Sequence, residues 1–330
     1  MKQSIHTNHK IASQNKEAKS CTACWALLRV RTVAFCFAKQ GGFMSSLWTE
    51  NIEMPEFPTL EKDIRTQVLI IGGGMAGVLC AYFLQQAGVD YCLLEKDRIC
   101  QGVTGHTTAK ITAQHGLIYE KSLQSMGQER AELFLKANLR AVENYKSLGR
   151  FLDCDMEETD SYLYSVRERR KLESEIQALG SLGFQADYVE DTELPFEVEG
   201  AIRFPRQAEF QPLKFAAGIS KNLRIYEHSE VREMTEYFAL TEKGSVAAEK
   251  IIIATHFPFI NTRGSYYLKL YQNRSYVLAC AHGKNLKGMY LEADNIGLSL
   301  RNYEDYLLIG GGGHRSGKEK SNWDLLRDLA

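Results

Sequence analysis

The sequence predicts a mixed α/β (α+β) fold, and three features of the chain support this prediction. Residues 67–95 contain a short apolar run, a helical stretch and a second apolar run, which is the pattern of a parallel βαβ unit. The middle of the chain alternates helical and strand patterns. Residues 268–309 contain several short strand patterns, as in a mixed or antiparallel sheet. We therefore expect two different sheets in one protein.

The βαβ unit begins with Val68 to Ile71, an unbroken apolar run that predicts a strand buried on both faces. Three glycines follow at GxGxxG spacing: Gly72, Gly74 and Gly77. Apolar side chains then recur at helical spacing until Gly88, where we expect the helix to stop. A second buried run, Tyr91 to Leu94, completes the unit and ends in Glu95.

These residues are the ones that dinucleotide binding needs. Gly72 permits a tight turn, Gly74 lets the backbone approach a pyrophosphate, and Gly77 lets the helix pack close to the sheet. The helix N-terminus offers unpaired N–H groups to the phosphates. Glu95 can accept hydrogen bonds from an adenosine ribose and would repel a 2′-phosphate, which disfavours NADP. The motif does not separate FAD from NAD.

Composition describes an ordinary globular chain. The 330 residues are 44% hydrophobic and 25% charged, with a formal net charge of −1. This balance provides no strong field for nucleic acid, and no apolar run is long enough to span a bilayer. The eight scattered cysteines predict free thiols in a reducing compartment, and hence a cytoplasmic protein.

Residues 1–43 differ from the rest, with seven Lys/Arg against one acid, Glu17, and no pattern of a core element. We expect a basic leader that is disordered or not native, a targeting segment being the alternative. Cys21 and Cys24 form a CxxC without a second ligand pair, so we expect no metal site.

A loop rich in small and hydroxyl side chains, GVTGHTTAK at residues 102–110, follows Glu95. Its position just after the ribose-binding acid favours contact with a cofactor. The remaining elements follow from periodicity and from breakers. We expect helices at 128–150, 167–182 and 213–221, a hairpin at 237–248, and strands at 161–166, 184–189, 224–226, near 231, and at 250–255, 275–281, 288–291, 298–301 and 306–309.

Several stretches together resemble one family. They are GGGMAG with Glu95, TGHTTAK, FQPLKFAAGI at 210–219, IIIAT at 251–255 and LLIGGGGHRSG at 307–317. They are similar to the D-amino-acid oxidase-type FAD-dependent oxidoreductases, in the bacterial branch whose longer members carry a C-terminal Rieske domain. The resemblance implies a Rossmann-like FAD-binding domain (residues 44–150 and 203–262) interleaved with a mixed or antiparallel β-sheet substrate domain (residues 151–202 and 263–330).

The resemblance also implies FAD as the cofactor and a set of residues that hold it. Gly72, Gly74, Gly77 and Glu95 would bind its adenosine diphosphate half, Thr104, Gly105, His106, Thr107 and Thr108 would lie along the pyrophosphate and flavin, Val231 would lie near the adenine, and Ala254 and Thr255 would line the cofactor edge. His106 occupies the place where some relatives attach flavin covalently, and we expect non-covalent contact here.

The implied reaction is oxidation of a C–N bond in a small amine or amino acid by hydride transfer to flavin N5. Oxygen or a Rieske-type protein would accept the electrons. His314 and Arg315 follow a strand and four glycines, and Arg315 could clamp a substrate carboxylate in bidentate fashion. We predict these two as the catalytic residues.

Two features depart from the family pattern. The chain has no Rieske ligand set, and no further strand–glycine–helix segment follows Gly317 to close the FAD site. We therefore expect a C-terminally truncated chain, and a fragment without independent activity is one alternative. An NAD-dependent dehydrogenase is another, although repeated βα units would then be expected.

Overall fold

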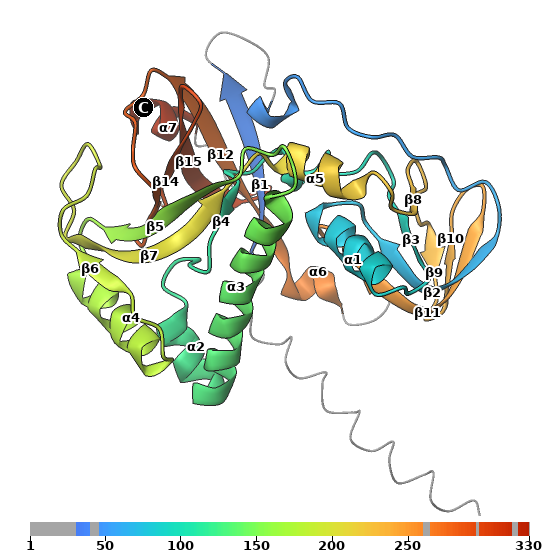
Figure 1. The fold of residues 1–330 in the computed structure, drawn as a ribbon, viewed down its shortest axis with the longest axis horizontal. Helices are drawn as coiled ribbons and strands as arrows, with labels where there is room; N and C mark the ends of the chain where they lie inside the picture. The colour runs from blue at the N-terminus through green and yellow to red at the C-terminus, as the bar shows by residue number, and fades with distance from the viewer. Residues whose placement is uncertain (1–30, 40–45, 260–264, 295–296, 319–322, 330) are drawn as a thin grey trace, which may run out of the picture.

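Two β-sheets organise the chain (Figure 1). The computed structural model describes residues 31–39, 46–259, 265–294, 297–318 and 323–329. Within these residues, one sheet has six strands and is mainly parallel, and the other has nine strands and is mainly antiparallel. The predicted α/β fold with a second, mixed sheet is confirmed.

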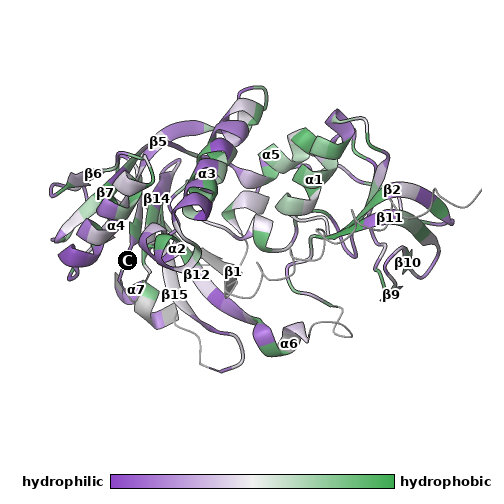
Figure 2. Cartoon of the chain, turned by 90° about the horizontal axis from the view of Figure 1, so that it is seen from below, coloured by the Kyte–Doolittle hydropathy of each residue, from purple (hydrophilic) through white to green (hydrophobic). Residues whose placement is uncertain are grey.

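The six-stranded sheet has the spatial order β8 (Ile225–Tyr226), β3 (Tyr91–Leu94), β2 (Ile64–Ile71), β11 (Ser245–Ile253), β10 (Phe238–Leu240) and β9 (Glu233–Met234). Its central strands are buried on both faces, as their apolar runs predict, and Ile70 and Leu93 are 0% exposed. The helices α1 (Met75–Gln86) and α5 (Pro212–Ser220) contact each other beside this sheet, and Figure 2 shows green, apolar residues along both.

The nine-stranded sheet lies on the other side of the molecule (Figure 1). Its order is β1 (Arg31–Lys39), β12 (Tyr271–Ala281), β15 (Tyr306–Arg315), β14 (Ser299–Tyr303), β13 (Met289–Glu292), β5 (Glu157–Ser165), β7 (Gly200–Glu209) and β4 (Lys110–Ile111), with β6 (Asp187–Val189) paired to β7. The helices α2 (Tyr119–Met126), α3 (Gln128–Gly149) and α4 (Arg169–Ser181) pack on one another and on this sheet.

The chain crosses between the sheets at other places than the predicted domain boundaries. β4 already belongs to the nine-stranded sheet, well before the predicted boundary at residue 150. β7 runs continuously from Gly200 to Glu209, across the predicted boundary at residue 202. A pattern of single elements does not reveal which sheet a strand joins, because that depends on pairing between distant segments. The assignment of an FAD part and a substrate part stays a prediction.

Residues 31–39 form a strand where the sequence analysis expected no core element. β1 pairs in parallel with β12, from Arg31 beside Tyr271 to Lys39 beside Ala279. The segment RTVAFCFAK is rich in β-branched and aromatic residues, which favour a strand. The strand was not predicted because residues 1–43 were judged together by their basic composition. The rest of the predicted leader, residues 1–30 and 40–43, lies outside the described residues.

The four glycines from Gly310 to Gly313 lie inside β15, and the prediction that they follow the strand is wrong. β15 pairs with β12 on one side and β14 on the other, and these ladders include Gly310 and Gly311. A Cβ added at Gly310 would lie 3.0 Å from the Thr108 methyl group, so a larger residue would require Thr108 to shift. Gly312 has φ +63° beside a register shift in β12.

Smaller differences concern the strands near the end of the six-stranded sheet. The predicted hairpin is present, with Leu240 paired to Ser245. Its second strand continues without a break into the predicted strand at 250–255, so that the two form the single strand β11. Val231 is buried but lies outside any strand, and β9 begins two residues later at Glu233.

Candidate cofactor-binding site

A cavity of about 1290 Å³ lies between the two sheets. It opens at the carboxyl ends of β2, β3 and β11, which is where ligands bind in open α/β sheets. One part, which we call the motif end, is lined by Gly72, Gly74, Glu95 and Val231. The other part, which we call the far end, is lined by Lys110, Thr112, His115 and Gln272.

The glycines of the motif play different roles. A Cβ at Gly77 would lie 1.9 Å from the Gly72 carbonyl oxygen, and a Cβ at Gly72 would lie 2.8 Å from the Ala254 carbonyl oxygen. Gly72 also has φ +107°, which side chains disfavour. Gly74 has only the Thr104 hydroxyl within 4 Å of such a Cβ, at 3.8 Å, and it lines the cavity. Gly72 and Gly77 therefore permit packing, and Gly74 leaves room for a ligand.

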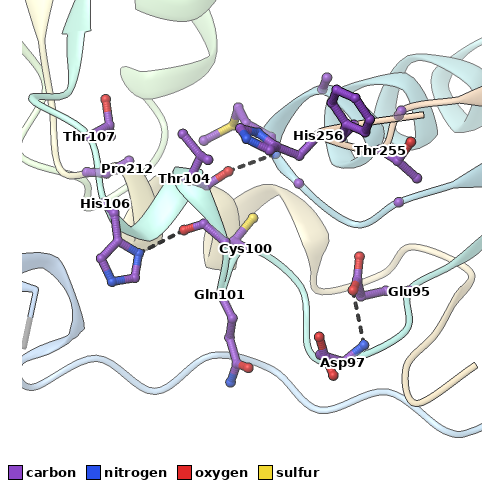
Figure 3. Close-up of a pocket in the computed structure, with 18 of the residues that line it drawn as sticks. Glu95, Asp97, Cys100, Gln101, Thr104, His106, Thr107, Pro212, Thr255 and His256 are labelled. Atoms are coloured by element: carbon purple, nitrogen blue, oxygen red, sulfur yellow. Dashed lines mark hydrogen bonds between the residues drawn. The ribbon is translucent and has the colours of Figure 1, made fainter. Parts of the chain in front are cut away.

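Glu95 stands at the end of β3 beside this turn. Its Oε2 accepts a hydrogen bond from the Gly73 N–H at 2.6 Å, and its Oε1 accepts one from the Asp97 N–H at 3.0 Å (Figure 3). The Glu95 carbonyl oxygen accepts from the Ser229 N–H at 2.8 Å, which brings the segment of Val231 to the same end of the cavity. The carboxylate is thus oriented by backbone before any ligand binds.

The loop at 102–110 supplies only some of its predicted contacts. Thr104, His106 and Thr107 line the cavity. The Thr104 hydroxyl accepts a hydrogen bond from the Met75 N–H at 3.1 Å at the start of α1, and His106 Nδ1 lies 2.9 Å from the Gly102 carbonyl oxygen (Figure 3). Gly105 and Thr108 are buried and do not line the cavity. Both pack behind the loop, Gly105 against Cys100 and Thr108 against Gly310.

Two residues that the sequence analysis missed hold this loop from behind. The Trp48 indole N–H donates to the Thr107 carbonyl oxygen at 2.6 Å. Arg301 on β14 donates from Nη1 to the carbonyl oxygens of Ala109, at 2.6 Å, and Thr108, at 3.2 Å. Arg301 is 1% exposed, and its Nε lies 3.4 Å from Glu209 Oε2. An arginine as the last residue of the strand predicted at 298–301 was the available signal.

Ala254 and Thr255, just after β11, line the cavity as predicted. Thr255 Oγ1 is buried and has no hydrogen-bond partner in the described residues. A buried hydroxyl beside a cavity is the kind of group that a bound ligand satisfies. His256 follows it in the cavity wall, and burial lowers its pKa.

The far end is built from elements that are distant in sequence. Burial lowers the pKa of His115, while a hydrogen bond from its side chain to Asn138 on α3 acts in the opposite direction. Burial and, to a smaller extent, the nearby Arg301 cation together lower the pKa of Lys110 to about 7, against an opposing effect of Glu209. Neither side chain was given a role of its own in the sequence analysis, although Lys110 is the last residue of the loop at 102–110.

Comparison with known proteins identifies the family. The model of the DAO family, described as FAD dependent oxidoreductase, matches residues 67–329. This chain belongs to the DAO family of FAD-dependent oxidoreductases. FAD is the cofactor of that family. The resemblance stated from the motifs is confirmed.

Individual relatives agree with this family. The chain is 33% identical over 315 residues to the Rieske 2Fe-2S iron-sulfur protein YhfW of Bacillus subtilis (strain 168), covering 89% of this chain and 62% of the relative. It is 24% identical over 220 residues to γ-glutamylputrescine oxidoreductase of Escherichia coli (strain K12), covering 60% and 50%. The chain thus spans about half to three fifths of the length of these relatives.

Solved structures share the fold. Glycine oxidase from Geobacillus kaustophilus superposes with a TM-score of 0.60 at 17% identity, covering 81% of this chain and 77% of that one. L-proline dehydrogenase from P. horikoshii superposes with a TM-score of 0.64 at 18% identity, covering 83% and 76%. At this level of identity the likeness concerns the fold alone.

The residues of the motif end fit the cofactor of the DAO family. The N-terminus of α1 can face its phosphates, Gly74 leaves room beside them, and Glu95 can accept from its ribose. The unpartnered Thr255 hydroxyl is a further group that it can satisfy.

The predicted catalytic pair lies elsewhere. Neither His314 nor Arg315 lines the cavity. His314 is buried, with Nε2 2.8 Å from the Tyr276 hydroxyl, and the Arg315 guanidinium lies over the Tyr271 ring, 4.8 Å from its centroid. Because the glycines extend β15, they carry both residues along the sheet instead of turning them toward the cavity. The arrangement therefore does not support the carboxylate clamp predicted for Arg315.

Other features of the described ranges bear on partners. No helix there combines the length and apolar character that crossing a bilayer requires. No three His, Cys, Asp or Glu side chains in those ranges come together to hold a metal ion. The described cysteines are free thiols, and burial raises the pKa of Cys100 beside the cavity to about 12. Cys100 is therefore a packing residue and not a nucleophile.

Proposed function

We propose that this chain oxidises a C–N bond of a small amino acid or amine with bound FAD. One observation carries the proposal: one cavity joins the motif end to a far end that is lined by residues of the nine-stranded sheet, such as Lys110 on β4 and Gln272 on β12. An enzyme of this kind needs both parts, one to hold the nucleotide and one to hold a substrate beside the flavin ring.

The names of the relatives support an amine substrate. Glycine oxidase, L-proline dehydrogenase and γ-glutamylputrescine oxidoreductase are named for molecules with an oxidisable C–N bond. The far end combines polar groups that could bind such a molecule, Lys110, His115 and Gln272, with the apolar and aromatic walls of Tyr145 and Phe210. Aromatic walls keep water away from the reacting carbon.

The chain's own residues would bind FAD and orient it. Glu95 would hold the ribose, and the α1 N-terminus with Thr104 would hold the phosphates. Bound FAD supplies the acceptor for the hydride that leaves the carbon next to nitrogen. Oxygen is one electron acceptor. A Rieske-type partner protein is another, suggested by the likeness to YhfW.

The test is a visible spectrum followed by substrate reduction without oxygen. Protein purified with added FAD and passed through gel filtration should keep flavin absorption, and glycine, proline or γ-glutamylputrescine should bleach it. Glycerol 3-phosphate, a C–O substrate, serves as the control and should leave the colour unchanged. Colourless protein that binds NAD would support a nicotinamide dehydrogenase instead. Colourless protein that binds neither cofactor would support a fragment that is inactive by itself.

A further inference from the structure

Lys110 reaches the far end of the cavity from β4, an edge strand of the nine-stranded sheet. It is half-buried on β4 and lines the cavity together with Thr112 and Gln272. Its Nζ donates a hydrogen bond to the Tyr290 carbonyl oxygen at 2.6 Å. In the described residues no carboxylate lies within ion-pair distance of this amine. A lysine without a counter-ion is unusual at a site of this kind.

The charged groups around Lys110 explain why it lacks a counter-ion. Glu209 on β7 stands opposite it in the strand ladder, but the Glu209 carboxylate is directed to Arg301, with 3.4 Å between Oε2 and Nε. Arg301 on β14 is itself a cation 1% exposed, and Glu157 on β5, the strand paired with β7, also interacts with Arg301 electrostatically. His115 faces the same cavity. Arg301 therefore forms the ion pair with the Glu209 carboxylate, and its positive charge repels the protonated amine of Lys110.

Burial and the Arg301 cation both favour the neutral amine of Lys110, and they lower its pKa to about 7 against a weaker opposing effect of Glu209. A neutral amine has two N–H groups and a lone pair. One N–H is used on Tyr290. At and above neutral pH the lone pair is therefore available to a ligand in the cavity.

We propose that Lys110 is the base that accepts a proton from the ammonium group of the substrate. This inference rests on the proposed function. Amino acids and alkyl amines enter as ammonium ions, and hydride transfer requires the free amine. The N–H bond of the substrate breaks, its electron pair stays on the substrate nitrogen, and the proton forms a new N–H bond on Lys110. Charge is conserved, since one ammonium replaces another and no oxidant is used in this step.

The first experiment measures Lys110 without catalysis. FAD-free protein is acetylated with pulses of acetic anhydride across the pH range, and the Lys110 peptide is quantified by mass spectrometry. Half-maximal labelling is expected near pH 7, because the pKa of Lys110 is lowered to about 7 from the ordinary 10.5. The exposed Lys171 on α4 in the same digest reports reagent activity. Labelling of Lys110 that rises only at strongly alkaline pH would overturn the inference, and so would no labelling at any pH.

The second experiment measures flavin reduction by the amine in rapid mixing without oxygen. Lys110→Met should keep FAD binding and lose about 100-fold or more in reduction rate at neutral pH. Lys110→Arg keeps a cation that cannot lose its proton, so it should fail equally. In both variants the pH at which the reduction rate falls on the acid side of its profile should move from near 7 to the pKa of the substrate ammonium group. Lys171→Met is the matched control and should behave as wild type.

The outcomes separate the two proposals. If no amine reduces the flavin of the wild-type protein, the result contradicts the proposed function and, with it, the role of Lys110. If amines reduce wild type, but Lys110→Met has an unchanged rate and pH profile, only the role of Lys110 is overturned. If Lys110→Arg retains activity while Lys110→Met loses it, Lys110 supplies charge and not a base.

Discussion

The two ends of the cavity are built by different means. At the motif end, backbone atoms form most of the site. Glu95 accepts a hydrogen bond from the Gly73 N–H, and Gly72 and Gly77 let chain segments approach closely. At the far end, the polar groups are side chains from separate elements, such as Lys110 on β4 and Gln272 on β12. Local sequence spacing builds the first end, and long-range packing builds the second.

This difference has a consequence for mutation. A substitution at the motif end should either remove the space that lets two backbone segments approach or remove one contact to the cofactor. A substitution at the far end should act through the charges of Arg301, Glu209 and Lys110, which interact with one another at buried or partly buried positions. The four predictions below test this contrast.

The largest effect is expected at Arg301. Arg301→Met leaves the Glu209 carboxylate buried without its cation and frees the carbonyl oxygens of Thr108 and Ala109. We expect a loss of about 3–5 kcal/mol in the free energy of unfolding, measured by urea denaturation. Burial raises the pKa of Glu209, so its protonated form is favoured in the fold, and the loss should be smaller at acid than at alkaline pH.

The control for Arg301 is an exposed pair of the same chemistry. Arg203 contacts Asp187 at 2.6 Å on the outer surface of the nine-stranded sheet. Arg203→Met should cost less than about 1 kcal/mol. Equal losses in both variants would show that Arg301 stabilises no more than a surface arginine does.

The second effect tests backbone contact at the motif end. Gly77→Ala would place a Cβ 1.9 Å from the Gly72 carbonyl oxygen, which a helix cannot accommodate without moving from the sheet. We expect about 3 kcal/mol of destabilisation and loss of FAD binding together, by urea denaturation and flavin titration. Gly180→Ala on α4 has open space around its Cβ and should stabilise slightly. An unaffected Gly77→Ala variant would contradict the close packing of α1.

The third effect concerns a single cofactor contact. Glu95→Ala should weaken FAD binding by about 1.5–3 kcal/mol, because a charge-assisted hydrogen bond to ribose is lost. Glu95→Gln retains an acceptor oxygen for the Gly73 N–H and should lose less. Titration of FAD-free protein by flavin fluorescence measures both, with the exposed Glu129→Ala as control. Equal affinity in Glu95→Ala and wild type would remove Glu95 from the site.

The smallest effect is expected at Arg315, which the sequence analysis placed in the reaction. Its guanidinium lies over Tyr271 at the surface and not in the cavity. Arg315→Lys should therefore leave the KM for an amino acid unchanged and alter stability by no more than about 0.5–1 kcal/mol, the range of an exposed cation–π contact. A raised KM with normal flavin content would restore the carboxylate clamp.

Much of the motif end could be predicted from the sequence. The strand ending at Ile71, the helix from Met75, the turn at Gly88 and the acid at Glu95 all lie where the pattern predicts them. These features depend on φ angles, apolar periodicity and short-range spacing, which neighbouring residues determine. The same local information identified the loop of Thr104 and His106, although Gly105 and Thr108 lie behind its cavity face.

The far end and the path of β15 were decided only by tertiary structure. His314 and Arg315 follow four glycines, and local reasoning expected a turn, whereas pairing with β12 and β14 holds the segment as a strand. Lys110 and Arg301 are 191 positions apart in the numbering, and although Lys110 ends the loop at 102–110, nothing in either local sequence shows that the two side chains come together. The lowered pKa of Lys110 arises from burial beside Arg301 and from the ion pair of Arg301 with Glu209, which leaves Lys110 without a carboxylate partner in the described residues. Charge, burial and strand pairing between distant segments are properties of the folded chain, so no local pattern contains them.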